Sequence, residues 1–282
     1  MTANQSQAEA WNGAESVHYV DHADRYDRQL APFADALIDH AQLDAHHAVL
    51  DVGCGTGATS LMAARRAATV LGADISQPLL DVAAERARAA SLDNAAFVVA
   101  DAQTYPFLPA TFDRIISQFG LMFFDDPVTA FRNLQRALTP GGRAVLVCWQ
   151  GLEANDWVMT VGRAVAEHVA LPDLGGQANG PGMFALKDPD ETASLLDAAG
   201  FTQIDIAPIA PTITLGGGGT LEESADFLLG AGIARGLLGR VESTARDAAI
   251  DTVRASLAGR YEPGVGVRLG AAAWLVSASR PH

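Results

Sequence analysis

Short apolar runs alternate along the chain with longer segments in which apolar residues recur every three or four positions. Such runs, bounded by turn residues, are typical of strands buried on both faces, and the longer spacing is typical of amphipathic helices. The alternation predicts an α/β fold built on an open parallel sheet with right-handed crossovers. The predicted strands, in chain order, are 48–52, 69–73, 96–100, 112–117, 143–149, 201–206 and 267–278.

Helical patterns fill the intervals between these strands. They begin at residues that suit a helix start, such as Ser76, Asp126 and Asp188, and two of them carry proline directly after that start. Glycine follows the end of several of them, as is common after a helix. The predicted helices are 58–67, 76–87, 126–139, 157–169, 188–200, 221–229, 233–238 and 244–257.

The N-terminal segment has a different pattern. Residues 1–29 are polar with scattered aromatic residues, and an amphipathic helix is expected from Leu30 through Ile38, with Pro32 in its first turn. Two segments near the other end also stand outside the strand and helix alternation. The Gly- and Pro-rich stretch 171–187 is expected to be a loop beside the site, and 220–260 is expected to be a helical insert before the last strand.

The stretch 48–57 combines the first strand with a glycine loop that leads into a helix. Glycines permit a tight turn and a close backbone approach to a ligand, and the start of the helix offers free N–H groups. This arrangement predicts a nucleotide site of unspecified kind. The spacing Gly53-x-Gly55-x-x-Ala58, with Asp74 about 20 residues beyond, also fits a dinucleotide-binding fingerprint, so a nicotinamide or flavin cofactor stays open at this point.

Acidic residues follow two successive predicted strands. In an open α/β sheet, ligands bind beyond the carboxyl ends of the strands. Asp74, after the second strand, suits the two hydroxyl donors of a ribose, and Asp101, after the third, suits an exocyclic amine such as that of adenine. Gln118 ends the fourth strand at the same edge.

Four segments, taken in order, resemble motifs of class I S-adenosylmethionine-dependent methyltransferases of the small-molecule, type 11/25-like branch. They are 49–57, Asp101-Ala102, 112–119 and 138–143. The resemblance implies a Rossmann-like sheet of seven mostly parallel strands with helices on both faces. Its last strand would be antiparallel and would lie between the fifth and sixth. It also implies a helical cap over residues 1–47 and a methyltransferase domain over 48–282, with 171–187 and 220–260 covering the substrate.

The resemblance further implies S-adenosyl-L-methionine as cofactor and methyl transfer to an O, N or C atom of a small molecule. The residues that would contact the cofactor are Asp51, Gly53, Cys54, Gly55, Asp74, Ile75, Asp101, Ala102, Gln118 and Tyr19. The sulfonium methyl is already activated, so alignment and exclusion of water are the main requirements, and no catalytic residue is assigned. His18, Tyr19 and His22 are candidate general bases only because the N-terminal segment could close over the site. The alternatives are a non-catalytic S-adenosylmethionine-binding protein and an NAD(P)-dependent oxidoreductase.

The amino-acid composition limits the kinds of partner that the protein is expected to bind. With 49% hydrophobic and 18% charged residues, the 282-residue chain is an ordinary globular protein, and a formal charge of −14 disfavours nucleic acid. Cys54 and Cys148 are too few for a disulfide framework, and no Cys/His set has zinc spacing, so no metal is expected. The polar first residues predict no secretory signal, and the longest apolar tract, 265–277, is too short to span a membrane. We therefore expect a cytoplasmic protein without membrane partners, and the oligomeric state stays open, a homodimer included.

Overall fold

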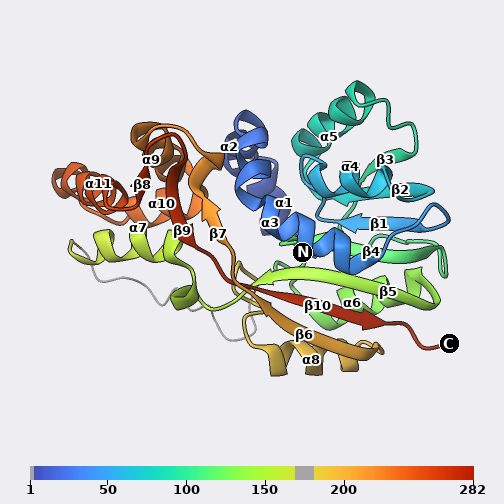
Figure 1. Ribbon diagram of the computed structural model, residues 1–282. Coiled ribbons are helices and arrows are strands. Elements are labelled where there is room, and N and C mark those ends of the chain that lie inside the picture. The colour runs from blue at the N-terminus through green and yellow to red at the C-terminus, as the bar shows by residue number, and fades with distance from the viewer. Residues whose placement is uncertain (1–2, 169–180) are drawn as a thin grey trace.

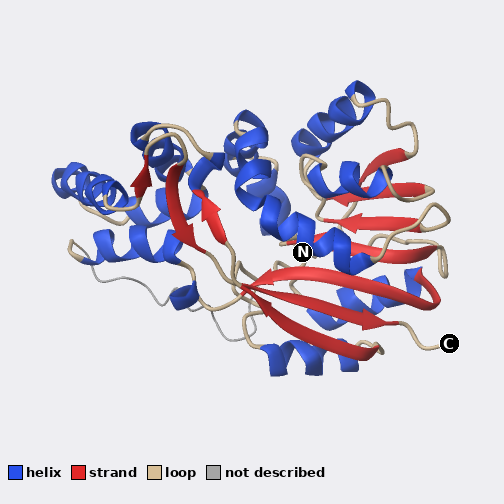
Figure 2. Ribbon diagram, viewed as in Figure 1, coloured by secondary structure: helices blue, strands red, loops and turns tan. Residues whose placement is uncertain are grey.

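The computed structural model describes residues 3–168 and 181–282. Its main feature is a seven-stranded sheet with the strand order β3-β2-β1-β4-β5-β10-β6, seen on the right of Figures 1 and 2. The strands are β1 Ala48–Val52, β2 Thr69–Asp74, β3 Ala95–Val99, β4 Phe112–Gln118, β5 Leu138–Trp149, β6 Thr202–Ile209 and β10 Ala273–Ser279.

The pairing of the strands confirms the predicted Rossmann-like topology. β1 runs parallel to both β2 and β4, β4 runs parallel to β5, and β10 is antiparallel to β5 and to β6, between which it lies. The apolar run of β1 explains its central place, since Val49 and Leu50 are completely buried. A strand covered on both faces needs apolar side chains on both.

Helices cover both faces of the sheet. Figure 1 shows α3 (Ala23–Ala41) crossing the near face, with α6 behind the sheet. The other helices that follow the strand alternation begin and end close to the predicted positions. These helices are α4 Ala58–Ala64, α5 Gln77–Ala89, α6 Pro127–Ala137, α7 Asp156–Ala166 and α8 Pro189–Ala198. No helix in the described ranges is long and apolar enough to cross a membrane.

The N-terminal segment contains more helix than the sequence pattern indicates. Two short helices, α1 (Gln5–Trp11) and α2 (Ala14–Asp21), precede α3, which begins at Ala23 and not at Leu30. The prediction that Pro32 lies in a first turn is therefore wrong. Proline in a helix interior removes one backbone hydrogen bond. The loss is offset because the turns on either side bury Tyr26, Phe33 and Leu37.

The predicted last strand, 267–278, is two strands. β9 (Gly266–Gly270) pairs with β7 (Thr212–Thr214) and β8 (Tyr261–Glu262) in a separate small sheet, and β10 enters the main sheet. Between β9 and β10 lies Ala272, whose N–H donates to Asn155 Oδ1 at 3.0 Å and whose carbonyl accepts from Asn155 Nδ2 at 3.3 Å. The fully buried Asn155 thus holds the chain where it leaves one sheet for the other. The run 267–278 is apolar apart from Arg268 and Ser277, and neither of these residues marks the change, which falls at Ala271 and Ala272.

The predicted helical insert is present as α9 (Leu221–Gly230), α10 (Gly232–Leu238) and α11 (Ser243–Ala258). These helices lie with α7 and the small sheet in the part at the left of Figure 1, separate from the main sheet. Most of the predicted loop 171–187 lies outside the described residues. Its described end is anchored where Gly182 N donates to Met122 O at 2.9 Å.

Candidate active site

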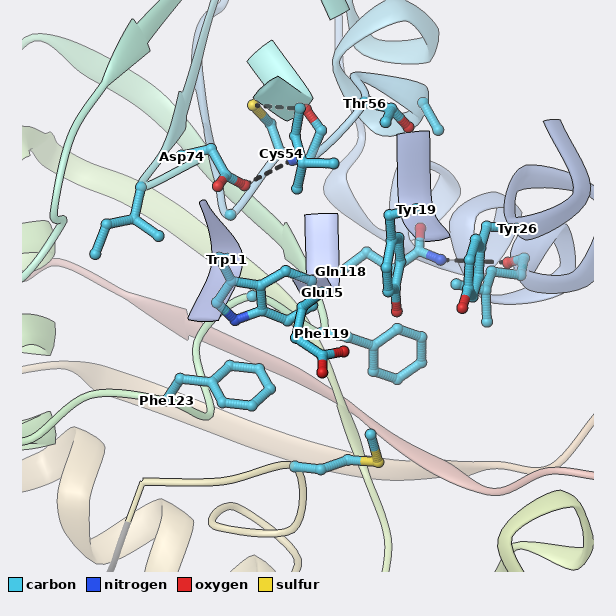
Figure 3. A pocket seen from close by; sticks show the side chains of 18 of the residues that line it. Trp11, Glu15, Tyr19, Tyr26, Cys54, Thr56, Asp74, Gln118, Phe119 and Phe123 are labelled. Atoms are coloured by element: carbon cyan, nitrogen blue, oxygen red, sulfur yellow. Dashed lines mark hydrogen bonds between the residues drawn. The ribbon is translucent and has the colours of Figure 1, made fainter. Parts of the chain in front are cut away.

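A cavity of about 550 Å³ opens at the carboxyl ends of β1, β2 and β4. Its walls come from the glycine loop after β1, the ends of β2 to β5, the helices α1 to α3, and the insert helices α9 and α10. Figure 3 shows some of its side chains, with Asp74 and Cys54 on one side and the rings of the N-terminal helices on another. A volume of this size is typical of small-molecule and cofactor sites.

The glycine loop after β1 is tight because three of its residues have positive φ. The φ values are +67° at Gly53, +52° at Gly55 and +86° at Gly57. A Cβ at Gly53 would lie 2.6 Å from the Cα of Gly120, so backbone meets backbone there. At Gly55 nothing lies within 4 Å of that position, and Gly55 lines the cavity. The loop therefore presents bare backbone to a ligand.

Asp74, at the end of β2, holds that loop in place. Its Oδ2 accepts from Gly55 N at 2.8 Å and its Oδ1 accepts from Ser76 N at 2.9 Å. Burial raises the pKa of the carboxyl, and the backbone hydrogen bonds from Ser76 and Gly55 oppose that shift. Asp74 lines the cavity, and each oxygen keeps a second lone pair for a ligand.

Asp51 supports the loop from behind. Its Oδ2 accepts from the hydroxyls of Thr59 at 2.7 Å and Ser60 at 2.6 Å, which ties β1 to the first turn of α4. Its Oδ1 is buried without a hydrogen-bond partner among the described residues, and burial raises the pKa of Asp51 to about 6. Asp51 is not part of the cavity wall, so its predicted contact with a cofactor stays a prediction.

Asp101 faces the cavity beside a residue that sequence reasoning missed. Asn4 Nδ2 donates to Asp101 Oδ1 at 2.8 Å and to Gln103 Oε1 at 3.2 Å, while Asn4 Oδ1 accepts from Asp125 N at 2.7 Å. Asn4 is 3% exposed and has a φ of 51°, a left-handed conformation that asparagine tolerates better than most residues. Nothing in the pattern of a polar N-terminus singles it out.

The cavity brings together the residues that sequence analysis assigned to the cofactor, apart from Asp51. Cys54 is buried, and burial together with the nearby Asp74 and Asp51 raises the pKa of its thiol well above the usual value, which keeps it neutral. Gln118 Nε2 donates to Leu30 O at 3.4 Å, so the amide also steadies α3. The predicted residues in the wall are Gly53, Cys54, Gly55, Asp74, Ile75, Asp101, Ala102, Gln118 and Tyr19.

Aromatic rings from separate segments form another side of the cavity, where Tyr19 is the one residue that the sequence assigned to the site. Tyr19 and Tyr26 stack with ring centroids 3.9 Å apart and planes 2° apart, and Trp11 meets Phe123 edge-on at 6.1 Å. Phe119 stacks on Trp149 at 3.8 Å. Figure 3 shows Trp11, Tyr19, Tyr26, Phe119 and Phe123 around one space. Tyr19 lies on α2 and Tyr26 on α3, so helical spacing does not predict this stack, nor its place beside rings from distant loops.

The candidate bases named from the sequence are poorly placed for that role. His18 and His22 are not in the cavity wall. Burial, together with His22 and Arg235, lowers the pKa of His18 to about 4. Burial and the nearby Glu15 raise the pKa of Tyr19 to about 12, so that phenol stays protonated near neutral pH. Glu15, which sequence analysis did not single out, does line the cavity.

Comparison with known proteins decides what kind of site this is. A family model for a methyltransferase domain matches residues 49–142. The demethylmenaquinone methyltransferase of Thermus thermophilus is 34% identical over 176 residues, which cover 58% of this chain and 79% of that protein. The chain belongs to the class I S-adenosylmethionine-dependent methyltransferase family. Its cofactor is S-adenosylmethionine, and membership in this family favours that interpretation of the glycine loop over a nicotinamide or flavin site.

Two further comparisons show how far the likeness of this methyltransferase extends. Methyltransferase GfsG of Streptomyces halstedii is 31% identical over 176 residues. The match covers 62% of this chain and 59% of GfsG, so this chain spans less than two thirds of that relative. The crystal structure of a Bacillus halodurans protein described as a methyltransferase aligns with a TM-score of 0.59 at 17% identity, covering 88% of this chain and 99% of that one. At that identity the structural match supports the fold alone.

Proposed function

We propose that this methyltransferase moves the methyl group of S-adenosylmethionine onto an O, N or C atom of a small molecule. The observation that supports the proposal is the composition of a single cavity. One side carries a glycine loop and two strand-end carboxylates, and the other side is built from aromatic rings. A nucleoside cofactor and an apolar acceptor need those two environments next to one another.

The residues present suit the cofactor. We expect the bare backbone at Gly55 to lie beside the amino-acid part of S-adenosylmethionine, with Gln118 on the other side of it. Asp74 is expected to accept from the ribose hydroxyls, and Asp101 from the adenine amine. Support comes from the open space above Gly55 and from the carboxylates of Asp74 and Asp101 in the wall of the cavity.

The bound cofactor supplies an activated methyl group on a positively charged sulfur. The protein's own task is then to align the acceptor with that methyl and to keep water away. The rings of Trp11, Phe123 and Tyr19 are suited to that task because they are rigid, apolar and supplied by different segments.

We infer that residues 1–47 act as a cap on a domain comprising 48–282. α1 and α2 contribute Trp11 and Tyr19 to the wall, while the same segment also buries Phe33 in the core. The insert contributes Leu228 and Ile233. We expect the insert and the loop 171–187 to cover the acceptor. Met183 is the part of that loop that lies in the described wall.

Two measurements test the proposal. S-adenosylhomocysteine should raise the melting temperature because it binds the native state and not the unfolded chain, and NAD should not. Radiolabelled S-adenosylmethionine incubated with a metabolite extract should then give a labelled small molecule. A shift with NAD alone would overturn the assignment, and cofactor binding without any labelled product would support a non-catalytic binding protein.

A homodimer and a cytoplasmic location stay predictions. Light scattering coupled to size exclusion would measure the mass of the particle in solution. Fractionation of cells that express the tagged chain would show where it resides.

A further inference from the structure

The charged side chains in the wall of the cavity are all carboxylates. They are Glu15, Asp27, Asp74 and Asp101, and no Lys, Arg or His lines the cavity within the described residues. The sequence 169–180, which the structure does not describe, contains none of these three either. A wall that carries only acids repels an anionic ligand and favours a neutral or cationic one.

Three of these four acids belong to the cofactor side of the cavity. Asp74 and Asp101 lie at the strand ends assigned to the cofactor. Asp27 forms an ion pair with Arg86, which also donates to the carbonyl of Thr56 in the glycine loop at 3.0 Å. Glu15 is the remaining one. It lies on α2 with its side chain 36% exposed, and Figure 3 shows its carboxylate among the labelled rings of Trp11, Phe119 and Phe123.

The insert positions the Glu15 carboxylate in two ways. Arg235 of α10 donates to Glu15 Oε1 at 2.9 Å and to Gly230 O at 3.1 Å, so the arginine fixes one oxygen. Gly232, also in the cavity wall, leaves room for the other oxygen, since a Cβ there would lie 2.0 Å from Glu15 Oε2. No hydrogen bond to Oε2 is made from the described part of the chain. One carboxylate oxygen is therefore anchored, and the other is available in the aromatic part of the cavity.

We propose that the acceptor is an uncharged or cationic molecule with a planar apolar body, and that Glu15 Oε2 accepts a hydrogen bond from its hydroxyl or amino group. The aromatic rings supply flat apolar surfaces for the body, and rings beside a carboxylate also suit a cation. The inference rests on the proposed function, because it assumes that the aromatic part of the cavity holds the acceptor.

Three probes of matched shape test the charge preference. They are 2-naphthol, which is neutral, 2-naphthylmethylamine, which is cationic, and 2-naphthoate, which is anionic. Each is titrated by calorimetry into protein saturated with S-adenosylhomocysteine. The neutral and cationic probes should bind, and 2-naphthoate should bind at least about tenfold more weakly. Its carboxylate would lie beside that of Glu15, and Arg235, which pairs with Glu15, is not itself in the wall of the cavity.

Two variants test the role of Glu15. Glu15→Gln should weaken 2-naphthylmethylamine roughly ten- to hundredfold and 2-naphthol less, because only the amine loses a charge-assisted hydrogen bond. Gly232→Ala keeps every charge but puts a methyl group where Oε2 lies, and should weaken the same probes about tenfold. Glu9→Gln is the matched control. It makes the same change of charge on an exposed position of α1, outside the cavity wall, and should change nothing.

The outcomes separate this inference from the proposed function. Should S-adenosylhomocysteine bind normally while 2-naphthoate binds as well as the others, the charge preference is wrong. Equal effects of Glu15→Gln and Glu9→Gln, or no binding of any probe to the loaded protein, would also overturn the inference. Loss of S-adenosylhomocysteine binding in the unmodified protein would instead overturn the proposed function, and this inference with it.

Discussion

The two sides of the cavity are built in different ways. On the strand-end side, the N–H of Gly55 in the glycine loop donates a 2.8 Å hydrogen bond to the Asp74 carboxylate, between segments that the sheet already places together. On the cap side, Trp11 contacts Tyr19 of the neighbouring helix α2 and Phe123, which lies far along the chain, and these contacts are side-chain packing alone. A site fixed by backbone geometry suits an unchanging cofactor. A site formed by side-chain packing can be altered by substitutions to suit a different acceptor, while the sheet stays the same.

The largest expected effect is on the strand-end side, at Gly53. Gly53→Ala would combine an unfavourable positive φ with a Cβ 2.6 Å from the Cα of Gly120. We expect a loss of several kcal/mol in the free energy of unfolding, on the order of 3 or more, because neither backbone can move away cheaply. Urea unfolding followed by circular dichroism measures the change.

Gly55→Ala is the matched control for that change. It has a φ of +52° but open space around the added methyl, so only the conformational cost of roughly 1–2 kcal/mol should appear. Equal losses at the two positions would show that the contact with Gly120 does not set the tightness of the loop.

The next effect concerns the buried Asp51, whose pKa in the folded state is about 6, above the usual 3.8. The folded protein then binds more protons than the unfolded chain between those pH values, so stability from this group falls as pH rises from about 4 through 6. Asp51→Asn should remove that slope. The stability of the native protein relative to this variant should be greater at pH 4 than at pH 7 by roughly 2 kcal/mol. Urea unfolding of both proteins at the two pH values tests this, and an unchanged difference would contradict the raised pKa.

The strand-end side is also the side that the sequence could predict. Its positions follow from local rules: an apolar run makes β1, glycines permit the turn, and acids that follow parallel strands meet at one edge. Asp74, Asp101 and Gln118 were found in this way, and the structure places all three in the wall of the cavity. Asp51 fits the same motif, but its carboxylate bonds to Thr59 and Ser60 outside the wall of the cavity, and its contact with the cofactor stays a prediction.

On the cap side the resemblance named Tyr19, which lies in the wall of the cavity. The rest of that side could not be predicted because its contacts are long-range. Asn4 reaches Asp101 across 97 positions of the chain, and Glu15 reaches Arg235 across 220. The two short N-terminal helices carry no strong apolar stripe, and the change of sheet at Ala272 falls within one apolar run. Long-range packing determines each of these features, and local sequence propensities do not predict it.

Substitution of the two strand-end acids compares how much each contributes to binding of the cofactor. Asp74→Ala and Asp101→Ala should each weaken S-adenosylhomocysteine about ten- to hundredfold, since a hydrogen bond to a charged group contributes roughly 1.5–3 kcal/mol. Asp74 should cost more because its loss also releases the N–H of Gly55. Calorimetric titration of both variants measures the losses, and a larger loss for Asp101→Ala would contradict this order.

An analogue of S-adenosylhomocysteine without the adenine amine tests the assignment of Asp101. It should bind the native protein poorly and lose little more on Asp101→Ala, because the group that Asp101 contacts is already missing. If the two losses simply added, Asp101 would not contact that amine.

The smallest expected effect lies in the cap, and its sign is opposite to that of Asp51. His18 Nδ1 lies 3.0 Å from Tyr26 Oη, and burial lowers the pKa of His18 from 6.5 to about 4. The unfolded chain therefore binds more protons between those pH values, so stability from this group is present above pH 6.5 and is lost as pH falls toward 4.

His18→Gln should cost stability at pH 7, where the ring packs against Tyr26 and Phe227, and cost less at pH 5. The change with pH should be smaller than for Asp51, because His18 is only partly buried and solvent screens its charge. Urea unfolding of both proteins at pH 7 and pH 5 measures it. The same difference at both pH values would mean that His18 titrates normally, and that the cap leaves this ring open to water.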